Sequence, residues 1–206
     1  MAEADESRRI EILNAAGSVF IEKGFEAATT AEIARRAKIS KRDLYAMFGS
    51  KQGLLEALIS THSRSMAIPA SLGVPRDREA FLGTLRSFGR IFLREFLESS
   101  RVALYRLAIA ESPRSTKLAE ALHESGALPV ITSAQAFMRH AVEKGIVPLC
   151  DAELVMATYF DVLIGPWQLR QLLGTHPRLD EASLAQQAER AVEVVRRLIE
   201  AGSAKA

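Results

Sequence analysis

Apolar residues recur at three- and four-residue intervals along most of this 206-residue chain, and this spacing limits the fold more than any other feature. One apolar helix face holds Ile10, Leu13, Gly17, Phe20 and Ile21, and another extends over residues 184–199. The alternating pattern of strands is nearly absent, and Asn-Gly and Asp-Gly hairpin turns do not occur. The sequence therefore predicts an all-α fold of about nine helices.

Proline and glycine residues divide this pattern into segments of unequal length. We expect breaks at residues 69–75, at Pro113, at residues 145–148 and at residues 174–177. Short helices fit residues 1–50, a connecting helix fits residues 51–66, and longer helices fit residues 67–206. The expected organisation is therefore a small N-terminal domain, a connecting helix and a larger C-terminal domain.

Several classes of protein are excluded by composition. A single cysteine, Cys150, excludes an intrachain disulfide and a multi-cysteine metal site. The four histidines are scattered and form no His-Glu-x-x-His pattern, so we expect no metal, no cofactor and no catalytic residues. No run of about 18 apolar residues is present to span a membrane. The acidic N-terminus lacks a signal-peptide core, so we expect a cytoplasmic protein.

Positive charge is concentrated in one window, although the net charge of the chain is only +2. Residues 35–51 contain one acidic residue, Asp43, beside six basic ones: Arg35, Arg36, Lys38, Lys41, Arg42 and Lys51. Such clustering favours phosphate binding, because each neutralised phosphate releases counterions from a nucleic acid. Charge alone leaves a solvated protein surface as an equal alternative.

Two helix-start signals accompany this window. Thr29 followed by Glu32 has the pattern of a capping box, in which each side chain bonds to the other residue's backbone N–H. Ser40 is a favourable N-cap for a second helix. These signals predict helices over residues 30–37 and 41–48, joined by a turn of about three residues, which is the geometry of a helix-turn-helix.

The second predicted helix has two different faces. The face expected in the core carries Leu44, Met47 and Phe48. The outward face carries Lys41, Arg42 and Tyr45. Arg42 can make a bidentate contact with guanine, and Tyr45 can reach a phosphate or a thymine methyl group. Lys51 begins the next helix, where we expect it to bind a phosphate.

Residues 8–58 resemble the DNA-binding domain of the TetR family of transcription regulators. The resemblance rests on residues 12–16, 20–25, 29–34, 37–40, 40–48 and 50–55, which follow the family's order and spacing. It implies that the DNA-contacting positions are occupied by Thr30, Ser40, Lys41, Tyr45 and Lys51. The sequence departs from the family at Arg42, where glycine is frequent, and at Ala46-Met47, where an aromatic–histidine pair is usual. Arg42 is therefore expected to add a base contact.

The resemblance also implies a homodimer that binds a palindromic operator in double-stranded DNA. The two long apolar-faced helices near residues 152–173 and 180–201 are the expected interface, with a kink at Gly165-Pro166. The alternative is that both helices bury their apolar faces inside one protomer.

Aromatic residues are frequent in the C-terminal region. We expect a pocket for a small hydrophobic effector, lined by Phe88, Phe92, Tyr105, Phe137, Phe160 and Trp167. Residues 105–113 resemble the corresponding segment of the AcrR-like branch, which also implies a hydrophobic effector. Plain core packing is the alternative for these aromatic side chains.

The prediction is thus a ligand-responsive DNA-binding regulator, a repressor that releases its operator when the effector binds. Two other classes were weighed. A small all-α enzyme would need converging acid–base groups, and the sequence shows no such constellation. A sequence-independent DNA-binding module without an effector would share the basic helix but would have no discrete palindromic site.

Overall fold

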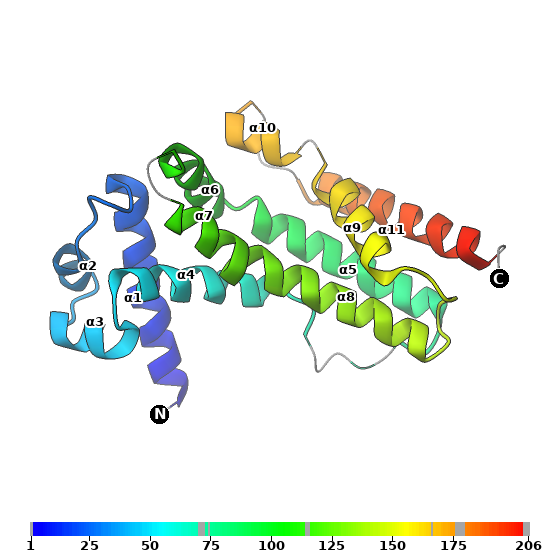
Figure 1. Cartoon of the computed structure of the whole chain (residues 1–206), viewed down its shortest axis with the longest axis horizontal. Coiled ribbons are helices and arrows are strands. Elements are labelled where there is room, and N and C mark those ends of the chain that lie inside the picture. Colours follow the sequence, from blue (N-terminus) through cyan, green and yellow to red (C-terminus); the bar gives the residue numbers. More distant parts are fainter. Residues whose placement is uncertain are drawn as a thin grey trace. The chain divides into compact units, whose positions relative to one another are not determined.

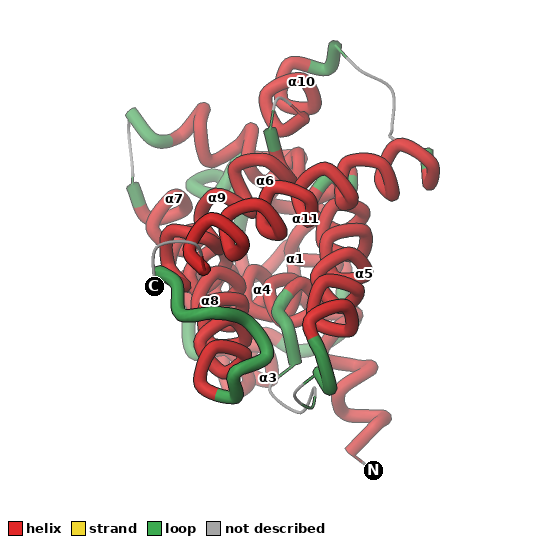
Figure 2. Tube along the Cα trace, turned by 90° about the vertical axis from the view of Figure 1, so that its right-hand side faces the viewer, coloured by secondary structure: helices red, strands yellow, loops and turns green. Residues whose placement is uncertain are grey.

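The computed structural model describes residues 2–69, 73, 75–113, 116–165, 167–175 and 180–203. Within these ranges the chain forms helices joined by loops and turns, with no strand (Figure 1, Figure 2). This confirms the predicted all-α fold. In chain order the elements are α1 (Ala2–Lys23), α2 (Thr30–Arg36), α3 (Lys41–Phe48), α4 (Lys51–Met66), α5 (Arg78–Phe96), α6 (Ser99–Glu111), α7 (Lys117–Ala121), the π-helical segment η1 (Leu122–Ala127), α8 (Leu128–Glu143), α9 (Ala152–Ile164), α10 (Trp167–Leu173) and α11 (Glu181–Ser203).

One predicted helix is in fact two. The sequence predicts a kinked helix over residues 152–173, but α9 ends at Ile164 and α10 begins at Trp167. Gly165 takes a φ of 45°, in the left-handed region that favours glycine, and its N–H donates to the Asp161 carbonyl at 2.9 Å. The second residue of the predicted kink, Pro166, lies outside the described residues.

Another helical stretch begins earlier than the sequence pattern indicates. The pattern predicts a helix from Leu128, whereas α7, η1 and α8 follow one another without a break from Lys117 to Glu143. Within η1 the sequence contains Ser125 and Gly126, which weaken the helix signal, and Pro129 is the second residue of α8. The π-helical turn accommodates these residues without ending the helix.

The described helices group into two compact units, each made of two separate chain segments. The first unit comprises Met1–Ser65 and Ser99–Leu128, and the second comprises Met66–Glu98 and Pro129–Ala206. The first unit therefore combines α1 to α4 with α6, α7 and η1. The functional division at residues 50 and 66 remains a prediction.

The first unit has one core to which both of its chain segments contribute. Phe20 of α1, Leu44 of α3 and Leu54 of α4 are completely buried there. Leu104 of α6 and Leu118 of α7 belong to the same apolar cluster. Helix α6 is thus part of the packing that supports the short N-terminal helices.

The second unit is built around α11, which packs against α5 and α9. The buried face of α11 repeats at helical spacing and consists of Leu184, Gln187, Ala188, Ala191, Val192, Val195 and Ile199. Tyr159 of α9 is also buried, and its hydroxyl donates to the Leu85 carbonyl of α5 at 2.8 Å. The apolar face predicted for residues 180–201 is therefore used inside the protomer.

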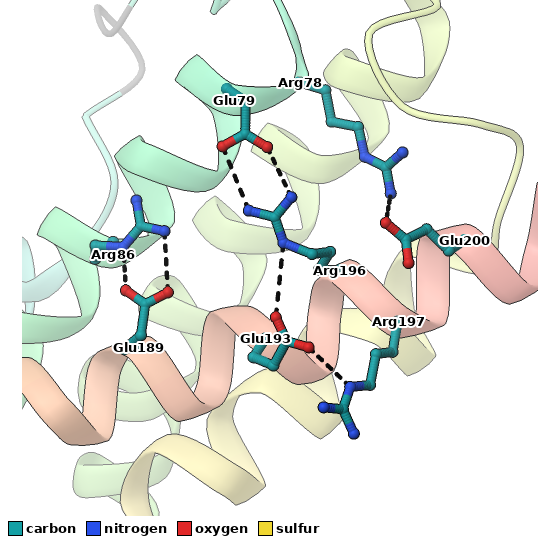
Figure 3. Close-up of polar contacts among 8 residues, drawn as sticks. All are labelled: Arg78, Glu79, Arg86, Glu189, Glu193, Arg196, Arg197 and Glu200. Atoms are coloured by element: carbon teal, nitrogen blue, oxygen red, sulfur yellow. Dashed lines mark hydrogen bonds and ion pairs between the residues drawn. The ribbon is translucent and has the colours of Figure 1, made fainter.

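Ion pairs flank the packing of α11 on α5, as Figure 3 shows for part of the row. Arg196 binds Glu79 at 2.7 Å and also approaches Glu193 at 3.6 Å. The other pairs between the two helices are Arg78–Glu200, Arg86–Glu189, Arg90–Glu181 and Arg94–Glu181. These pairs are partly exposed, so they set the register of the two helices more than they stabilise the fold.

Because the arginine side chains donate hydrogen bonds to Glu79, Glu181 and Glu189, the pKa of each carboxyl lies below its usual value of 4.5. A lowered folded-state pKa adds stability above the unfolded-state pKa, and this contribution is lost as the pH falls through the folded-state pKa. We expect the free energy of unfolding, measured in urea, to decline below about pH 4.5. The decline should be shallower when all three glutamates are changed to glutamine. The single change Glu26→Gln, at an exposed site in the first unit, should leave the decline unaltered.

Gly89 of α5 leaves no room for a side chain beside α9 and α11. A Cβ atom there would lie 2.6 Å from the Tyr159 hydroxyl oxygen and 3.2 Å from the Leu163 Cδ1 atom. We therefore expect Gly89→Ala to lower the free energy of unfolding by about 1–3 kcal/mol through overpacking. Gly83→Ala on the same helix is the matched control, because its Cβ would meet only Arg86 Nη1 at 3.9 Å. That change should be neutral or stabilising by up to about 1 kcal/mol. Equal effects of the two changes in urea denaturation would contradict this account.

Candidate nucleic-acid interface

The helices α2 and α3 both begin at side-chain caps. The Thr29 hydroxyl accepts the Glu32 N–H at 3.2 Å, and the Ser40 hydroxyl accepts the Asp43 N–H at 3.0 Å. Ser40 also donates to the Asp43 carboxylate at 2.7 Å. Both predicted helix starts are therefore confirmed. The Glu32 carboxylate binds Arg35 and Arg36, so the second half of the predicted capping box is not seen.

The turn between the two helices is closed by backbone bonds and by an arginine of α1. Lys38 has a φ of 54°, in the left-handed region, and the Ile39 N–H donates to the Ala34 carbonyl at 3.0 Å. Arg8 Nη2 donates to the carbonyls of Ala37 at 2.9 Å and Lys38 at 3.1 Å. These bonds fix the direction in which the chain enters α3.

Helix α3 buries a narrow stripe. Leu44 and Phe48 are buried, and the Arg9 guanidinium lies 4.8 Å from the centre of the Phe48 ring. Met47 is 40% exposed, so its predicted place in the core is wrong. Two turns of helix bury only the i, i+4 pair, and Met47 lies at the edge of that stripe.

Three side chains of α3 that carry predicted DNA contacts are open to solvent. Lys41 and Arg42 are exposed in its first turn, and Tyr45 is 45% exposed one turn later. The Tyr45 hydroxyl lies 3.1 Å from the Thr30 hydroxyl, within hydrogen-bond distance, and Thr30 is the buried first residue of α2. The structure therefore brings Thr30, Lys41, Arg42 and Tyr45 to one end of the helix-turn-helix, beside the cap Ser40.

Part of the predicted positive charge is neutralised by glutamates. Arg36 binds Glu22 of α1 at 2.6 Å and Glu32 at 3.1 Å, and Arg35 binds Glu32 at 2.8 Å. These bonds lower the pKa of Glu22 and of Glu32 and raise that of Arg36. With the described residues, Lys38, Lys41 and Arg42 form no ion pair, so the charge available to a phosphate is concentrated at the turn and at the start of α3.

Lys51 is engaged differently from the other cations. Its ammonium donates to the carbonyls of Phe25 at 2.8 Å, Glu26 at 3.0 Å and Ala28 at 3.2 Å. The same group lies 4.6 Å from the centre of the Phe25 ring. An ammonium has three N–H donors, and all three have acceptors here. Phosphate binding by Lys51 remains a prediction, and in the structure Lys51 fixes the loop between α1 and α2.

The six predicted effector residues are not gathered at one place. Phe88, Phe92 and Phe160 contact one another in the second unit, with ring centres 5.3 to 6.1 Å apart. Two more of the six lie in the same unit but have other neighbours. Phe137 of α8 stacks on Phe81, and the ring of Trp167 of α10 lies against the Arg170 guanidinium. Tyr105 lies on α6 in the first unit.

Tyr105 instead lines a pocket of about 400 Å³ that the sequence analysis missed. Its walls come from α6, α7 and η1 and consist of Tyr105, Ala108, Ile109, Ser112, Ala119, Leu122, His123 and Ala127. The only sign of this pocket in the sequence is the alanine at several of these positions, because small side chains on facing helices leave room for a ligand between them. The sequence does not reveal which helices face each other.

The described residues show neither a membrane-spanning helix nor a metal site. None of their helices is long and apolar enough to cross a membrane. No group of three or more histidine, cysteine, aspartate or glutamate side chains comes together among them in a way that could hold a metal ion. The exposed start of α3 thus remains the strongest candidate site.

The bonds of Lys51 lead to a stability difference between two lysines. We expect Lys51→Ala to lower the free energy of unfolding by about 1–3 kcal/mol, because three backbone carbonyls lose a charged donor. Lys41→Ala, at an exposed site without such bonds, should change it by less than about 0.5 kcal/mol. Urea denaturation of the two variants tests this, and equal stabilities would show that the Lys51 bonds contribute nothing.

Comparison with known proteins matches both parts of the chain to transcription regulators. Residues 12–58 match the family described as bacterial regulatory proteins, tetR family. Residues 83–198 match the C-terminal domain of AefR-like transcriptional repressors. The uncharacterized HTH-type transcriptional regulator YdeS of Bacillus subtilis (strain 168) is 26% identical over 170 residues, which cover 82% of this chain and 80% of YdeS.

Solved structures agree over nearly the whole chain. A TetR transcriptional regulator from Agrobacterium tumefaciens superposes with a TM-score of 0.76 at 26% identity, covering 95% of this chain and 98% of that one. The flavonoid-responsive regulator FrrA superposes with a TM-score of 0.70 at 28% identity, covering 93% and 96%. These relatives are regulators and not enzymes. The chain therefore belongs to the TetR family of bacterial DNA-binding transcription regulators.

Proposed function

We propose that this protein is a homodimeric, ligand-responsive repressor that binds a palindromic operator through α3 in the cytoplasm. The observation that carries the proposal is the division of α3 into a buried pair, Leu44 and Phe48, and an exposed face with Lys41, Arg42 and Tyr45. A helix fixed on one side and cationic on the other suits insertion into the major groove.

Each exposed side chain of α3 has a distinct role in this proposal. Arg42 makes a bidentate contact with guanine, because a guanidinium matches the two acceptors on its major-groove edge. Lys41 binds a phosphate. Tyr45, which is bonded to Thr30, contacts a phosphate or a thymine methyl group. Ser40 and Lys51 are the remaining proposed DNA contacts. Lys51 would replace one of its hydrogen bonds to a backbone carbonyl with a hydrogen bond to a phosphate.

The second copy is proposed to dock on the outer faces of the helices near residues 152–173 and 180–201. Leu154 of α9 and Leu169 and Leu173 of α10 are 60%, 61% and 67% exposed, respectively. The inner face of α11 is already buried against α5 and α9, so these exposed leucines are the apolar side chains proposed for the contact. Dimerisation would place two recognition helices about 34 Å apart, one turn of DNA.

A family match and one relative support the regulatory part of the proposal. The C-terminal match is to repressors, and the relative FrrA is named for its response to flavonoids. We propose a small hydrophobic effector for the present protein as well. The effector lowers DNA affinity only to the extent that it binds the DNA-free conformation better than the DNA-bound one.

Operator binding is the direct test of this function. A DNA site selected from a random library should have a palindromic sequence and should be protected as one discrete stretch in a footprint. Even protection along the whole DNA fragment would indicate a sequence-independent module.

Arg42→Ala should weaken the free energy of operator binding by about 1–3 kcal/mol per protomer and should relax the sequence preference at one base pair of each half-site. Lys41→Ala should lower the salt slope of binding by about two, one for each protomer. Lys144→Ala, at an exposed site in the second unit, is the control and should bind like the wild type. Unchanged affinity of both α3 variants would contradict the proposal.

A further inference from the structure

The turn that connects α2 with α3 contains a residue in a strained conformation. Lys38 has a φ of 54°, and among the described residues other than glycine it alone has a positive φ. Its N–H donates to the Arg35 carbonyl at 3.2 Å, and the Ile39 N–H donates to the Ala34 carbonyl at 3.0 Å. These are the bonds of a Schellman motif, in which glycine usually takes the left-handed position because a side chain disfavours it. The turn therefore gains from support outside its own backbone.

Arg8 of α1 supplies this support from 30 positions earlier in the sequence. Its Nη2 atom donates to the carbonyls of Ala37 at 2.9 Å and Lys38 at 3.1 Å. These carbonyls belong to the two peptide groups on either side of the strained Cα atom. Rotation of either peptide group would break a bond to a charged donor, and such bonds are stronger than bonds between neutral groups. Arg8 therefore fixes the backbone where the chain turns toward α3.

The surroundings of Arg8 direct it toward the protein and not toward a phosphate. Its Nη1 atom donates to the Glu11 carboxylate at 2.8 Å, one turn later on the same helix. This carboxylate offsets the charge of the guanidinium and would repel a phosphate that approached it. Both terminal nitrogens of the guanidinium thus have acceptors within the protein.

The next residue of α1 lies against the other end of α3. The Arg9 guanidinium lies 4.8 Å from the centre of the ring of Phe48, the buried last residue of α3. A cation over an aromatic ring is attracted to the negative face of the ring. Consecutive arginines of α1 therefore hold the turn before α3 and the final residue of α3.

The orientation of α3 matters most for contacts with base edges. A bidentate contact between Arg42 and guanine requires two donors to meet two acceptors at the same time. A small rotation of the helix would disturb this match, whereas the attraction of cations to the phosphates would change little. Loss of the Arg8 bonds should therefore affect sequence recognition more than general affinity for DNA.

We propose that Arg8 is a positioning residue for operator recognition, and that it acts through the carbonyls of Ala37 and Lys38 without contacting the DNA. The inference rests on the proposed DNA-binding function and adds to it a residue outside the helix-turn-helix. Arg8 keeps the strained turn in the conformation from which α3 presents Arg42 and Tyr45. Specificity for the operator thus depends on a side chain that touches neither base nor phosphate.

Binding of Arg8→Ala to two DNA duplexes tests this role. One duplex carries the selected operator, and the other is a scrambled sequence of the same length and composition. Affinity for the operator should fall about tenfold. Affinity for the scrambled duplex and the salt slope of operator binding should match the wild type. Arg64→Ala is the matched control, because it removes an exposed arginine of the same unit that bonds to Thr61 of its own helix, and it should bind both duplexes like the wild type.

Three other results would overturn the proposal. A direct phosphate contact would lower both affinities and would reduce the salt slope by about two, as expected for Lys41→Ala. A role in overall stability alone would also lower both affinities together, since an unfolded chain binds neither duplex specifically nor as a folded surface. Unchanged operator affinity would show that the Arg8 bonds do not orient α3.

A change at Lys38 tests whether Arg8 acts through the turn. Lys38→Gly removes the strain, because glycine adopts a positive φ readily. In this background Arg8→Ala should lower operator affinity by about threefold or less, compared with about tenfold in the wild type. Comparison within each background cancels the direct effect of removing the Lys38 charge. An equal loss in both backgrounds would show that Arg8 acts elsewhere and would overturn the proposal.

These outcomes separate the role of Arg8 from the proposed function. A wild-type chain that selects no discrete DNA site refutes the proposed function, and the role of Arg8 falls with it. A chain that binds its operator with the same affinity after Arg8→Ala refutes only the positioning role.

Discussion

The anchoring of α3 by Leu44 and Phe48 is the constraint on which the interface depends. A helix of eight residues is not stable by itself in water, because nucleation costs more than so few hydrogen bonds return. The Ser40 cap and the burial of these two side chains supply the free energy that an isolated helix of this length lacks. Once both are buried, the helix cannot rotate, and Arg42 and Tyr45 are directed away from the buried stripe. Lys41 lies seven residues before Phe48, on the same side of the helix, and is exposed as the first residue of α3. Packing inside the first unit therefore determines which side chains of α3 a DNA duplex would contact.

The same unit also explains why a small N-terminal region needs partners from later in the chain. Leu104 and Leu118 complete the apolar cluster around Phe20 and Leu54. The Glu111–Phe25 bond joins residues 86 positions apart in the same unit. Helix α6 falls within the match to the C-terminal repressor domain, yet it belongs to the first unit and packs against α1.

Sequence reasoning succeeded where the physics is local. The caps Thr29 and Ser40 act on N–H groups three residues away, so the starts of α2 and α3 could be read directly. Periodicity gave the all-α fold and the buried face of α11. Met47 was misplaced because helical phase alone does not say how wide a buried stripe is.

Features that depend on distant partners could not be predicted. Arg36 was counted as available charge because Glu22 is 14 residues earlier and on another helix. The three carbonyls that bind Lys51 could not be read from the sequence either, because they belong to a loop more than 20 residues before it. Likewise, the pocket at α6 depends on which helices face each other. In each case the residue type was informative, but its partner was set by the tertiary fold.

Proximity of α3 to DNA is the central claim, and tethered cleavage measures it directly. In a Cys150→Ser background, an iron chelate attached to Ala46→Cys would generate radicals beside the exposed face of α3. The account predicts two clusters of cuts in the operator, separated by about one helical turn of DNA. The same chelate on Lys144→Cys, an exposed position of the second unit outside the proposed dimer interface, should give no cuts. Cuts from position 144 and none from α3 would contradict the assignment of the interface.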